Sequence, residues 1–148
     1  MARRTTLSGM SSAASFLWPH RVRFSDTDAS GRIHYTAMLR FFEAAEVEFL
    51  RTLGILYTDI QDGETSYPRV RIECNYTGAV RDDDVVEIAV AVERVGKSSF
   101  TLAFDARVGG RQAAEGRITV VCMNVATQAS RPLPENLAAI LRSRLEPR

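Results

Sequence analysis

Two aspartates and a histidine stand close together in the first quarter of the chain, as Asp26, Asp28 and His34, with Gly31 between them. A carboxylate can attack a carbonyl carbon or take a proton from water, and an imidazole can act as a base or a hydrogen-bond donor. Gly31 lets the backbone approach a ligand closely. The segment therefore contains the groups that chemistry at a polarised carbonyl needs, with Asp28 as one candidate. The alternative for Asp28 is to stabilise a turn or cap a helix, and we expect Asp26 to shape the loop.

An apolar helix is expected immediately after this segment, over residues 36–53. Met38, Phe42, Ala45 and Phe49 recur at three- and four-residue steps, and further apolar residues widen the stripe. A helix with so wide an apolar face is usually covered by other structure on several sides. Its first turn would present unpaired N–H groups and the positive end of the helix dipole. Both can stabilise an oxygen that becomes negative during a reaction.

Segments with alternating apolar and polar residues, typical of strands, lie on both sides of this helix in the sequence. The first covers residues 18–25, with its inner face formed by Trp18, His20, Val22 and Phe24. A loop or partly helical segment at 55–68 follows the helix. Four more strands and a short terminal helix come next, over 70–76, 86–93, 100–108, 113–124 and 135–144. On the first of these four, the residues expected to share one apolar face are Val70, Ile72, Cys74 and Tyr76.

Long antiparallel strands twist and curl a sheet, and the concave face of a curled sheet must be filled. Only the 36–53 helix is apolar on enough sides to fill it. We therefore expect an α+β fold in which a curled antiparallel β-sheet is wrapped around one long central α-helix. Such a unit keeps exposed sheet edges and an outer face, so we also expect a homodimer or homotetramer.

The composition is that of an ordinary globular chain of 148 residues, with 45% hydrophobic and 25% charged residues and a net charge of +1. A net charge this small does not indicate binding to nucleic acid or to a membrane surface. No apolar run approaches the roughly 18 residues of a membrane-spanning helix. We expect a flexible tail over residues 1–16, a single domain over 17–148 and a cytoplasmic location. Cys74 and Cys122 are expected to be reduced core thiols, and neither stands in a metal-binding CxxC pair.

The loop and the start of the helix resemble a known family. The resemblance rests on Asp26-Thr27-Asp28-Ala29-Ser30-Gly31 and on Phe41-Phe42-Glu43-Ala44-Ala45, and it extends over about residues 18–140. This pattern is similar to that of the hotdog-fold thioesterases, above all the 4-hydroxybenzoyl-CoA thioesterase-like superfamily. The resemblance implies hydrolysis of an acyl-CoA or acyl-carrier thioester, with coenzyme A as part of the substrate and no other cofactor or metal.

The resemblance also implies roles for individual residues. Asp28 would be the nucleophile or general base, and backbone N–H groups around His34 and Tyr35 would polarise the thioester carbonyl beside Gly31. Glu46 is a second acidic candidate, because related thioesterases place a catalytic acid on the central helix; the alternative is that it pairs with an arginine. His34 could be a second base or could pack beside Tyr35, and His20 is expected to be a hydrogen-bonded histidine in the core or at an interface. The residues expected to bind substrate are Phe42, Tyr76, Lys97 and Ser99.

Two other functions remain open on the same fold. A hotdog dehydratase or hydratase would use an Asp and a His in an Asp-x-x-x-x-His spacing, whereas five residues separate Asp28 from His34 here. A non-catalytic acyl- or lipid-binding protein would have no need of Asp28. The sequence does not indicate the length or chemical class of the acyl group.

Overall fold

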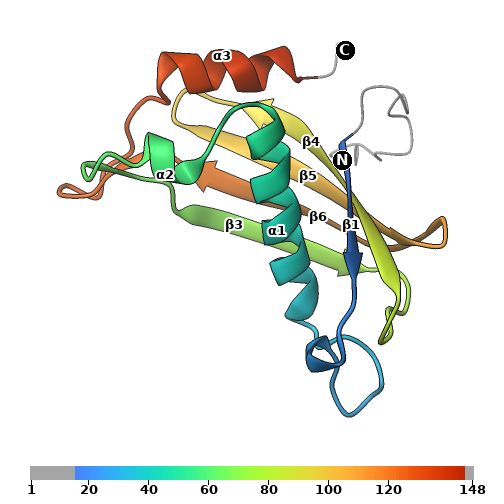
Figure 1. Ribbon diagram of the computed structural model, residues 1–148. Helices are drawn as coiled ribbons and strands as arrows, with labels where there is room; N and C mark the ends of the chain where they lie inside the picture. The colour runs from blue at the N-terminus through green and yellow to red at the C-terminus, as the bar shows by residue number, and fades with distance from the viewer. Residues whose placement is uncertain (1–15, 146–148) are drawn as a thin grey trace, which may run out of the picture.

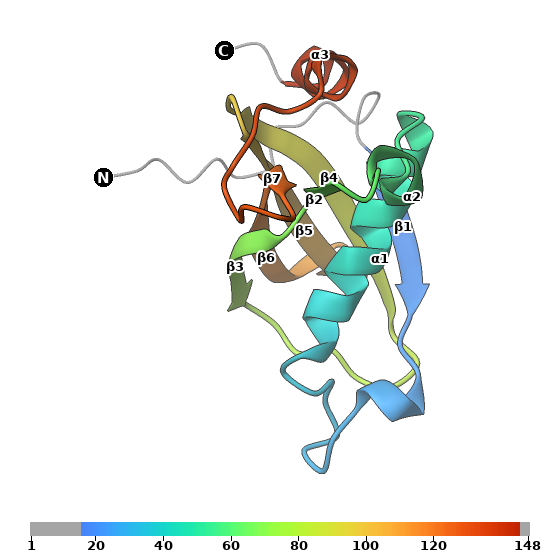
Figure 2. The same cartoon turned by 90° about the vertical axis from the view of Figure 1, so that its left-hand side faces the viewer.

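The computed structural model describes residues 16–145 as a curled sheet with one long helix on its concave face (Figures 1 and 2). The elements are β1 (Phe16–Arg21), the 3-10 turn η2 (Phe24–Asp26), α1 (Ala37–Thr52), α2 (Tyr57–Ile60), β2 (Thr65–Ser66), β3 (Arg69–Tyr76), β4 (Val85–Val95), β5 (Ser99–Val108), β6 (Arg111–Val121), β7 (Met123–Asn124) and α3 (Glu135–Ser143). Five antiparallel strands form the main sheet in the order β1-β4-β5-β6-β3, and β2 pairs with β7 separately. The predicted α+β hotdog fold is confirmed.

The helix α1 supplies much of the core, as its wide apolar stripe predicts. Phe42 has no exposed surface, and its ring stacks on Phe104 of β5 with centroids 4.7 Å apart. Gly116 of β6 makes room for this ring, because a Cβ atom there would lie 2.7 Å from the Phe42 ring and 2.3 Å from the Glu73 carbonyl oxygen. The predicted bounds of the helix, 36–53, differ from α1 by one residue at each end.

The first strand is shorter than predicted. β1 ends at Arg21, and Phe24, expected on the inner face, begins the η2 turn with 81% of its surface exposed. The physical reason is local hydrogen bonding. The Asp26 carboxylate accepts from the Arg23 N–H at 2.9 Å, and the Asp26 N–H donates to the Arg23 carbonyl. These bonds form a tight turn in place of a strand ladder.

The strand β3 is less covered than its alternation predicts. Cys74 is half-buried, but Val70, Ile72 and Tyr76 are 57%, 51% and 47% exposed. β3 is an edge strand, and its register with β6 shifts between Arg69 and Arg71. The face that these residues share is therefore largely open, because an alternating pattern identifies a strand but not what covers it.

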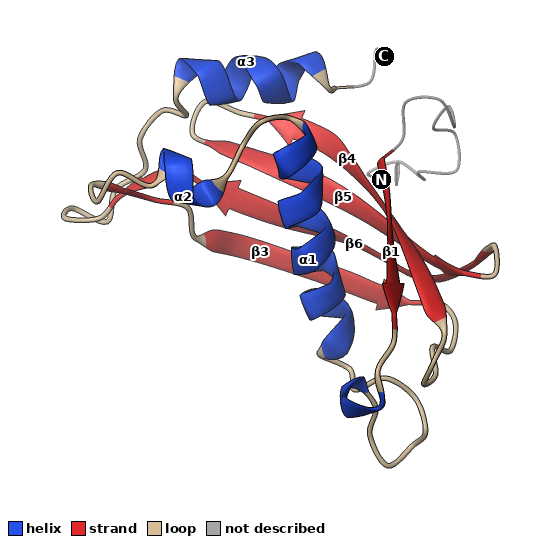
Figure 3. Ribbon diagram, viewed as in Figure 1, coloured by secondary structure: helices blue, strands red, loops and turns tan. Residues whose placement is uncertain are grey.

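The ends of the chain lie mostly outside the described residues. The tail predicted over residues 1–16 falls there except for Phe16, which is the first residue of β1 and therefore lies in the sheet. Figure 3 shows α3 against the end of the sheet opposite the η2 loop. Between residues 16 and 145, no helix is long and apolar enough to cross a membrane.

Candidate active site

The loop that carries Asp28 lies between η2 and the start of α1. The Asp28 N–H donates to the Arg32 carbonyl at 3.0 Å, and the Gly31 N–H donates back to the Asp28 carbonyl at 3.0 Å. Gly31 has a φ of +80°, a conformation that side chains with a Cβ rarely adopt. Gly31 thus serves to close a tight turn that presents the Asp28 side chain.

The Asp28 carboxylate is exposed and hydrogen-bonded to one neighbour. Its Oδ1 accepts from the Ser30 hydroxyl at 2.5 Å and from the Ser30 N–H at 2.8 Å. The hydroxyl first, and then the backbone N–H, stabilise the charged form and hold the pKa of Asp28 below its usual value. Asp28 is therefore ionised at neutral pH, as a nucleophile or general base must be. The arrangement is also an Asx-type turn, so this geometry matches the turn-stabilising alternative for Asp28 as well.

Asp26 fixes this loop to the helix. Its side chain is buried, with Oδ2 accepting from the Arg23 N–H and Oδ1 lying 3.0 Å from the Arg40 guanidinium of α1. Its backbone carbonyl accepts from the His34 N–H at 2.7 Å. Burial alone would raise the pKa of Asp26, but the Arg23 N–H and Arg40 outweigh it and lower the pKa. The loop-shaping role expected for Asp26 matches this geometry.

His20 lies beside Asp26 but belongs to the core. Its ring lies 5.3 Å from the Trp18 ring and 4.2 Å from the Phe41 ring. Its Nε2 is 3.8 Å from Asp26, beyond hydrogen-bond distance, and has no partner among residues 16–145. Burial lowers the pKa of His20 and favours the neutral imidazole. His20 is therefore a half-buried residue packed on the core, but its Nε2 lacks the hydrogen bond expected of a core or interface histidine.

Backbone donors at the start of α1 differ in availability. The His34 N–H is taken by Asp26, and the Thr36 N–H points to the His34 ring nitrogen at 3.2 Å. Within the described chain, the Tyr35 N–H donates to no protein acceptor. Of the two donors expected around His34 and Tyr35, the one available to a carbonyl oxygen is therefore that of Tyr35.

The side chains of His34 and Tyr35 pack together, with ring centroids 4.4 Å apart. His34 Nδ1 lies 2.8 Å from the Thr36 hydroxyl, so the imidazole is engaged locally. Tyr76 of β3 donates its hydroxyl to the Tyr35 carbonyl and thereby ties the sheet edge to the start of the helix. Tyr35 and Tyr76 line a cavity of about 160 Å³ with Ile33 and Val80.

The other predicted site residues lie elsewhere. Phe42 is enclosed in the core and offers no surface to a substrate, so the structure contradicts its predicted role in substrate binding. Lys97 and Ser99 lie at the turn between β4 and β5, near α3 and at the other end of the molecule from Asp28 (Figure 1). Glu46 is buried and pairs with Arg69 at 2.9 Å, the alternative predicted for it. A single chain therefore brings Asp28, Gly31, His34, Tyr35 and Tyr76 together, but not Phe42, Glu46, Lys97 and Ser99.

Ser30, Arg40 and Arg69 contact the predicted residues of the loop and of α1, but none of them is among the site residues predicted from the sequence. Ser30, two residues after Asp28, fits a known turn pattern and could have been identified from it. The pairings of Arg40 with Asp26 and of Arg69 with Glu46 join residues 14 and 23 positions apart, and no local pattern marks them.

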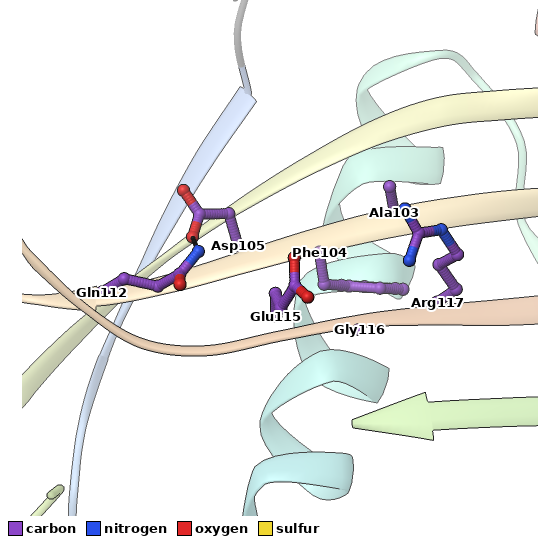
Figure 4. Close-up of a pocket in the computed structure, with 7 residues that line it drawn as sticks. All are labelled: Ala103, Phe104, Asp105, Gln112, Glu115, Gly116 and Arg117. Carbon is purple, nitrogen blue, oxygen red and sulfur yellow. Dashed lines mark hydrogen bonds between the residues drawn. The ribbon is translucent and has the colours of Figure 1, made fainter. Parts of the chain in front are cut away.

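Another pocket, with polar side chains, lies between β5 and β6, away from the Asp28 loop (Figure 4). Gln112 donates to Asp105 at 3.0 Å, and the Arg117 guanidinium donates to Glu93 at 2.8 Å. The cavity holds about 10 Å³, room for no more than a water molecule.

Among residues 16–145 there is also no cluster of three or more His, Cys, Asp or Glu side chains that could hold a metal ion. The loop at the start of α1 is therefore the best candidate site.

Comparison with known proteins gives the thioesterase class that the sequence resemblance predicts. The model of the thioesterase-like superfamily matches residues 22–141. The chain belongs to this family.

Named relatives and a solved structure have similar sequences. The acyl-CoA thioester hydrolase YbgC of Escherichia coli O6:H1 is 27% identical over 84% of this chain and 93% of its own. The 1,4-dihydroxy-2-naphthoyl-CoA hydrolase of Prochlorococcus marinus is 30% identical over 72% of this chain and 74% of its own. The structure of a gentisyl-coenzyme A thioesterase superposes with a TM-score of 0.77 at 26% identity, covering 85% of this chain and 99% of that one.

Proposed function

We propose that this protein hydrolyses acyl-CoA thioesters, with Asp28 as nucleophile or general base and the Tyr35 N–H as a donor to the thioester oxygen. The observation that carries the proposal is the ionised, exposed Asp28 carboxylate on a loop that Asp26 fixes to the start of α1. The names of the relatives support coenzyme A thioesters as the substrate class.

Two reaction routes use the same residues. In the first, Asp28 attacks the carbonyl carbon and the thiolate of coenzyme A leaves, and water then hydrolyses the resulting mixed anhydride. In the second, Asp28 takes a proton from water while the oxygen of that water adds to the carbonyl carbon. The thiolate then leaves and is protonated. In both routes the carbonyl oxygen becomes negative next to the first turn of α1.

The start of α1 suits this oxygen for two reasons. The Tyr35 N–H has no competing acceptor within residues 16–145, and the helix dipole places partial positive charge at this end. One such donor is worth about 10²-fold or more in rate in enzymes with an oxyanion hole. Tyr76 fixes the Tyr35 peptide through its hydroxyl, which gives it a positioning role.

The proposal is tested by thiol release from short, medium, long and aromatic acyl-CoAs. We expect the native protein to turn over part of this panel and a folded Asp28→Asn variant to lose nearly all of that turnover. Absence of turnover for every acyl-CoA would contradict the proposed function. If the native protein is active and Asp28→Asn keeps full activity, the result would contradict the role of Asp28 but not the proposed thioesterase function.

A further inference from the structure

A cleft of about 490 Å³ runs between α1 and β3. Leu39 and Val47 of α1, Ile72 of β3 and Ile118 of β6 form apolar walls. Glu46 and Arg69 lie at the end of this cleft that is remote from the Asp28 loop. The cleft is thus an apolar channel with a polar group at one end.

The polar end is a connected group of three side chains. The Glu46 carboxylate is only 1% exposed and accepts from the Tyr57 hydroxyl and from the Arg69 guanidinium, each at 2.9 Å. The guanidinium carbon of Arg69 lies 4.7 Å from the centre of the Tyr57 ring. Burial, and then the neighbouring Glu46, raise the pKa of Tyr57, so its hydroxyl remains a donor. Hydrogen bonds and the Glu46–Arg69 ion pair therefore fix the group in place.

Arg69 has capacity left for a ligand. Its side chain is 31% exposed, and it donates to the Tyr67 carbonyl and to Glu46 within the described chain. A guanidinium carries five N–H donors. The remaining donors can therefore bind an oxygen that enters the cleft.

The cleft begins at the first turn of α1, where Leu39 and Arg40 line it, and Arg40 pairs with Asp26 of the loop that carries Asp28. Tyr35 lies two residues before α1, and its carbonyl accepts from the Tyr76 hydroxyl. Glu46 stands nine residues after Ala37, about 14 Å along the helix axis. Arg69, at the beginning of β3, pairs with Glu46 at that distance from the start of α1. An acyl group that starts at Tyr35 can extend along this path towards Arg69.

We infer, on the basis of the proposed function, that this cleft holds an extended acyl group and that Arg69 binds a neutral oxygen, hydroxyl or keto, near its distal end. Charge favours a neutral group, because the two arginines of the cleft are already paired, Arg69 with Glu46 and Arg40 with Asp26, while Glu43 also lines the cleft and would repel a carboxylate. An unsubstituted alkyl end would cover donors of Arg69 without supplying an acceptor, which is unfavourable.

The test compares decanoyl-CoA, ω-hydroxydecanoyl-CoA and the mono-CoA thioester of decanedioic acid. We expect kcat/KM of the native protein to be about tenfold higher for the ω-hydroxy substrate than for decanoyl-CoA, because one hydrogen bond to a charged group is gained. In Arg69→Met this ratio is expected to fall to about one. Arg71→Met, an exposed arginine two residues along β3, serves as the matched control and should keep the native ratio.

Binding to the Asp28→Asn variant separates this inference from the proposed function. Calorimetry should give the same preference for the ω-hydroxy thioester, whether or not the protein hydrolyses it. If Arg69→Met fails to fold, Tyr57→Phe, which removes one hydroxyl, should still weaken the preference.

Three results would overturn the inference. The native protein could bind decanoyl-CoA and ω-hydroxydecanoyl-CoA equally well, or it could bind the decanedioyl thioester most tightly. Folded Arg69→Met could also keep the native ratio of kcat/KM between the ω-hydroxy substrate and decanoyl-CoA. A lower oligomeric mass in Arg69→Met with an unchanged ratio would assign the cleft to contact with a second copy of the chain.

Discussion

The pKa of Asp28 is lowered mainly by hydrogen bonds from one neighbour, Ser30. Both of its side-chain hydrogen bonds come from Ser30, and they hold the pKa of Asp28 below the ordinary value. Activity that requires the carboxylate should therefore persist as the pH falls through the usual range of an aspartate. Replacing Ser30 with Ala removes the stronger of the two contacts and keeps the backbone one.

For Ser30→Ala we expect the acid limb of the kcat/KM profile to move to higher pH, because the pKa of Asp28 rises when the hydroxyl is lost. The measurement is kcat/KM for one acyl-CoA across the acid range in both proteins. Thr127→Ala, another exposed hydroxyl in a loop, is the control and should leave the limb unmoved. An acid limb that does not shift in Ser30→Ala would show that the limb reports another group.

The buried Asp26 carboxylate contributes to stability through its contacts with the Arg23 N–H and the Arg40 guanidinium. Asp26→Ala leaves the Arg23 N–H without its acceptor and Arg40 without its partner. We expect a loss of about 2 kcal/mol in the free energy of unfolding. Asp26→Asn keeps an acceptor for Arg23 and should cost less. Denaturant unfolding of the three proteins measures both changes, and equal stability of all three would contradict the anchoring role.

The stabilisation from Asp26 should also depend on pH in a defined direction. Its pKa is lowered in the folded state from the ordinary value of 3.8. The contribution is therefore complete above that value and is lost as the pH falls through the lower pKa of the folded protein. The difference in stability between native protein and Asp26→Asn should accordingly shrink at acid pH.

At the scale of single residues, the sequence predicts the chemical groups but not their pairing. Asp28 and Gly31 could be identified because their types and spacing within one loop carry the information. Phe42 could not be assigned correctly, because the sequence marks it as apolar but does not reveal that Phe104 and Gly116 enclose it. Such enclosure depends on the register between strands that are distant in sequence.

At the scale of elements, the packing of α1 against the sheet requires a close approach at Gly116 of β6. Gly116 lies where β6 meets both β3 and the Phe42 ring, and no side chain fits there. Gly116→Ala should lower the free energy of unfolding by about 2 kcal/mol or more, because overpacking displaces backbone as well as a ring. Thermal unfolding measures this loss.

Gly96→Ala is the matched control for Gly116→Ala. A Cβ at Gly96 would approach no closer than 3.3 Å to the Ser99 hydroxyl, and the turn can adjust. We expect its midpoint of unfolding to stay near the native value. Equal midpoints for the two variants would mean that the α1–sheet contact tolerates displacement.

The elements themselves follow largely from the alternation and periodicity of the sequence. The long helix, the four later strands and the terminal helix lie where these patterns predict them. The differences from prediction fall at β1, at β3 and at residues 113–124, which form parts of β6 and β7 in two separate sheets instead of one strand. At β1 the hydrogen bonds of Asp26 end the strand before Phe24, and at β3 the edge position leaves Val70 and Ile72 exposed. Both outcomes depend on contacts beyond the strand.

At the scale of the whole molecule, the two sheet edges differ in their capacity to pair. β1 contains Pro19, which has no N–H to donate, and Leu17 is its one strongly exposed apolar residue among those described. β3 has no proline and exposes Val70, Ile72 and Tyr76. An edge of this kind readily pairs with another strand. The predicted homodimer or homotetramer is therefore expected to form through β3.

Val70→Lys should weaken this assembly, because a charge at the edge opposes strand pairing. Sedimentation at two protein concentrations measures the mass of the native protein and the variant. Leu17→Lys places the same charge on the other edge strand, where the exposed fraction is similar, at 55% against 57%. A monomeric native protein, or equal effects of the two substitutions, would contradict pairing through β3.

The central claim is that Asp28 carries thioester hydrolysis, and kcat/KM of Asp28→Asn on the best acyl-CoA substrate tests it most directly. Asp62→Asn is the matched control, because Asp62 is also an exposed loop aspartate whose pKa is lowered by hydrogen bonds from Glu64 and Thr65. We expect Asp28→Asn to lose about 10²-fold or more in kcat/KM, with unchanged folding, and Asp62→Asn to keep native activity. Native activity in folded Asp28→Asn would contradict the account.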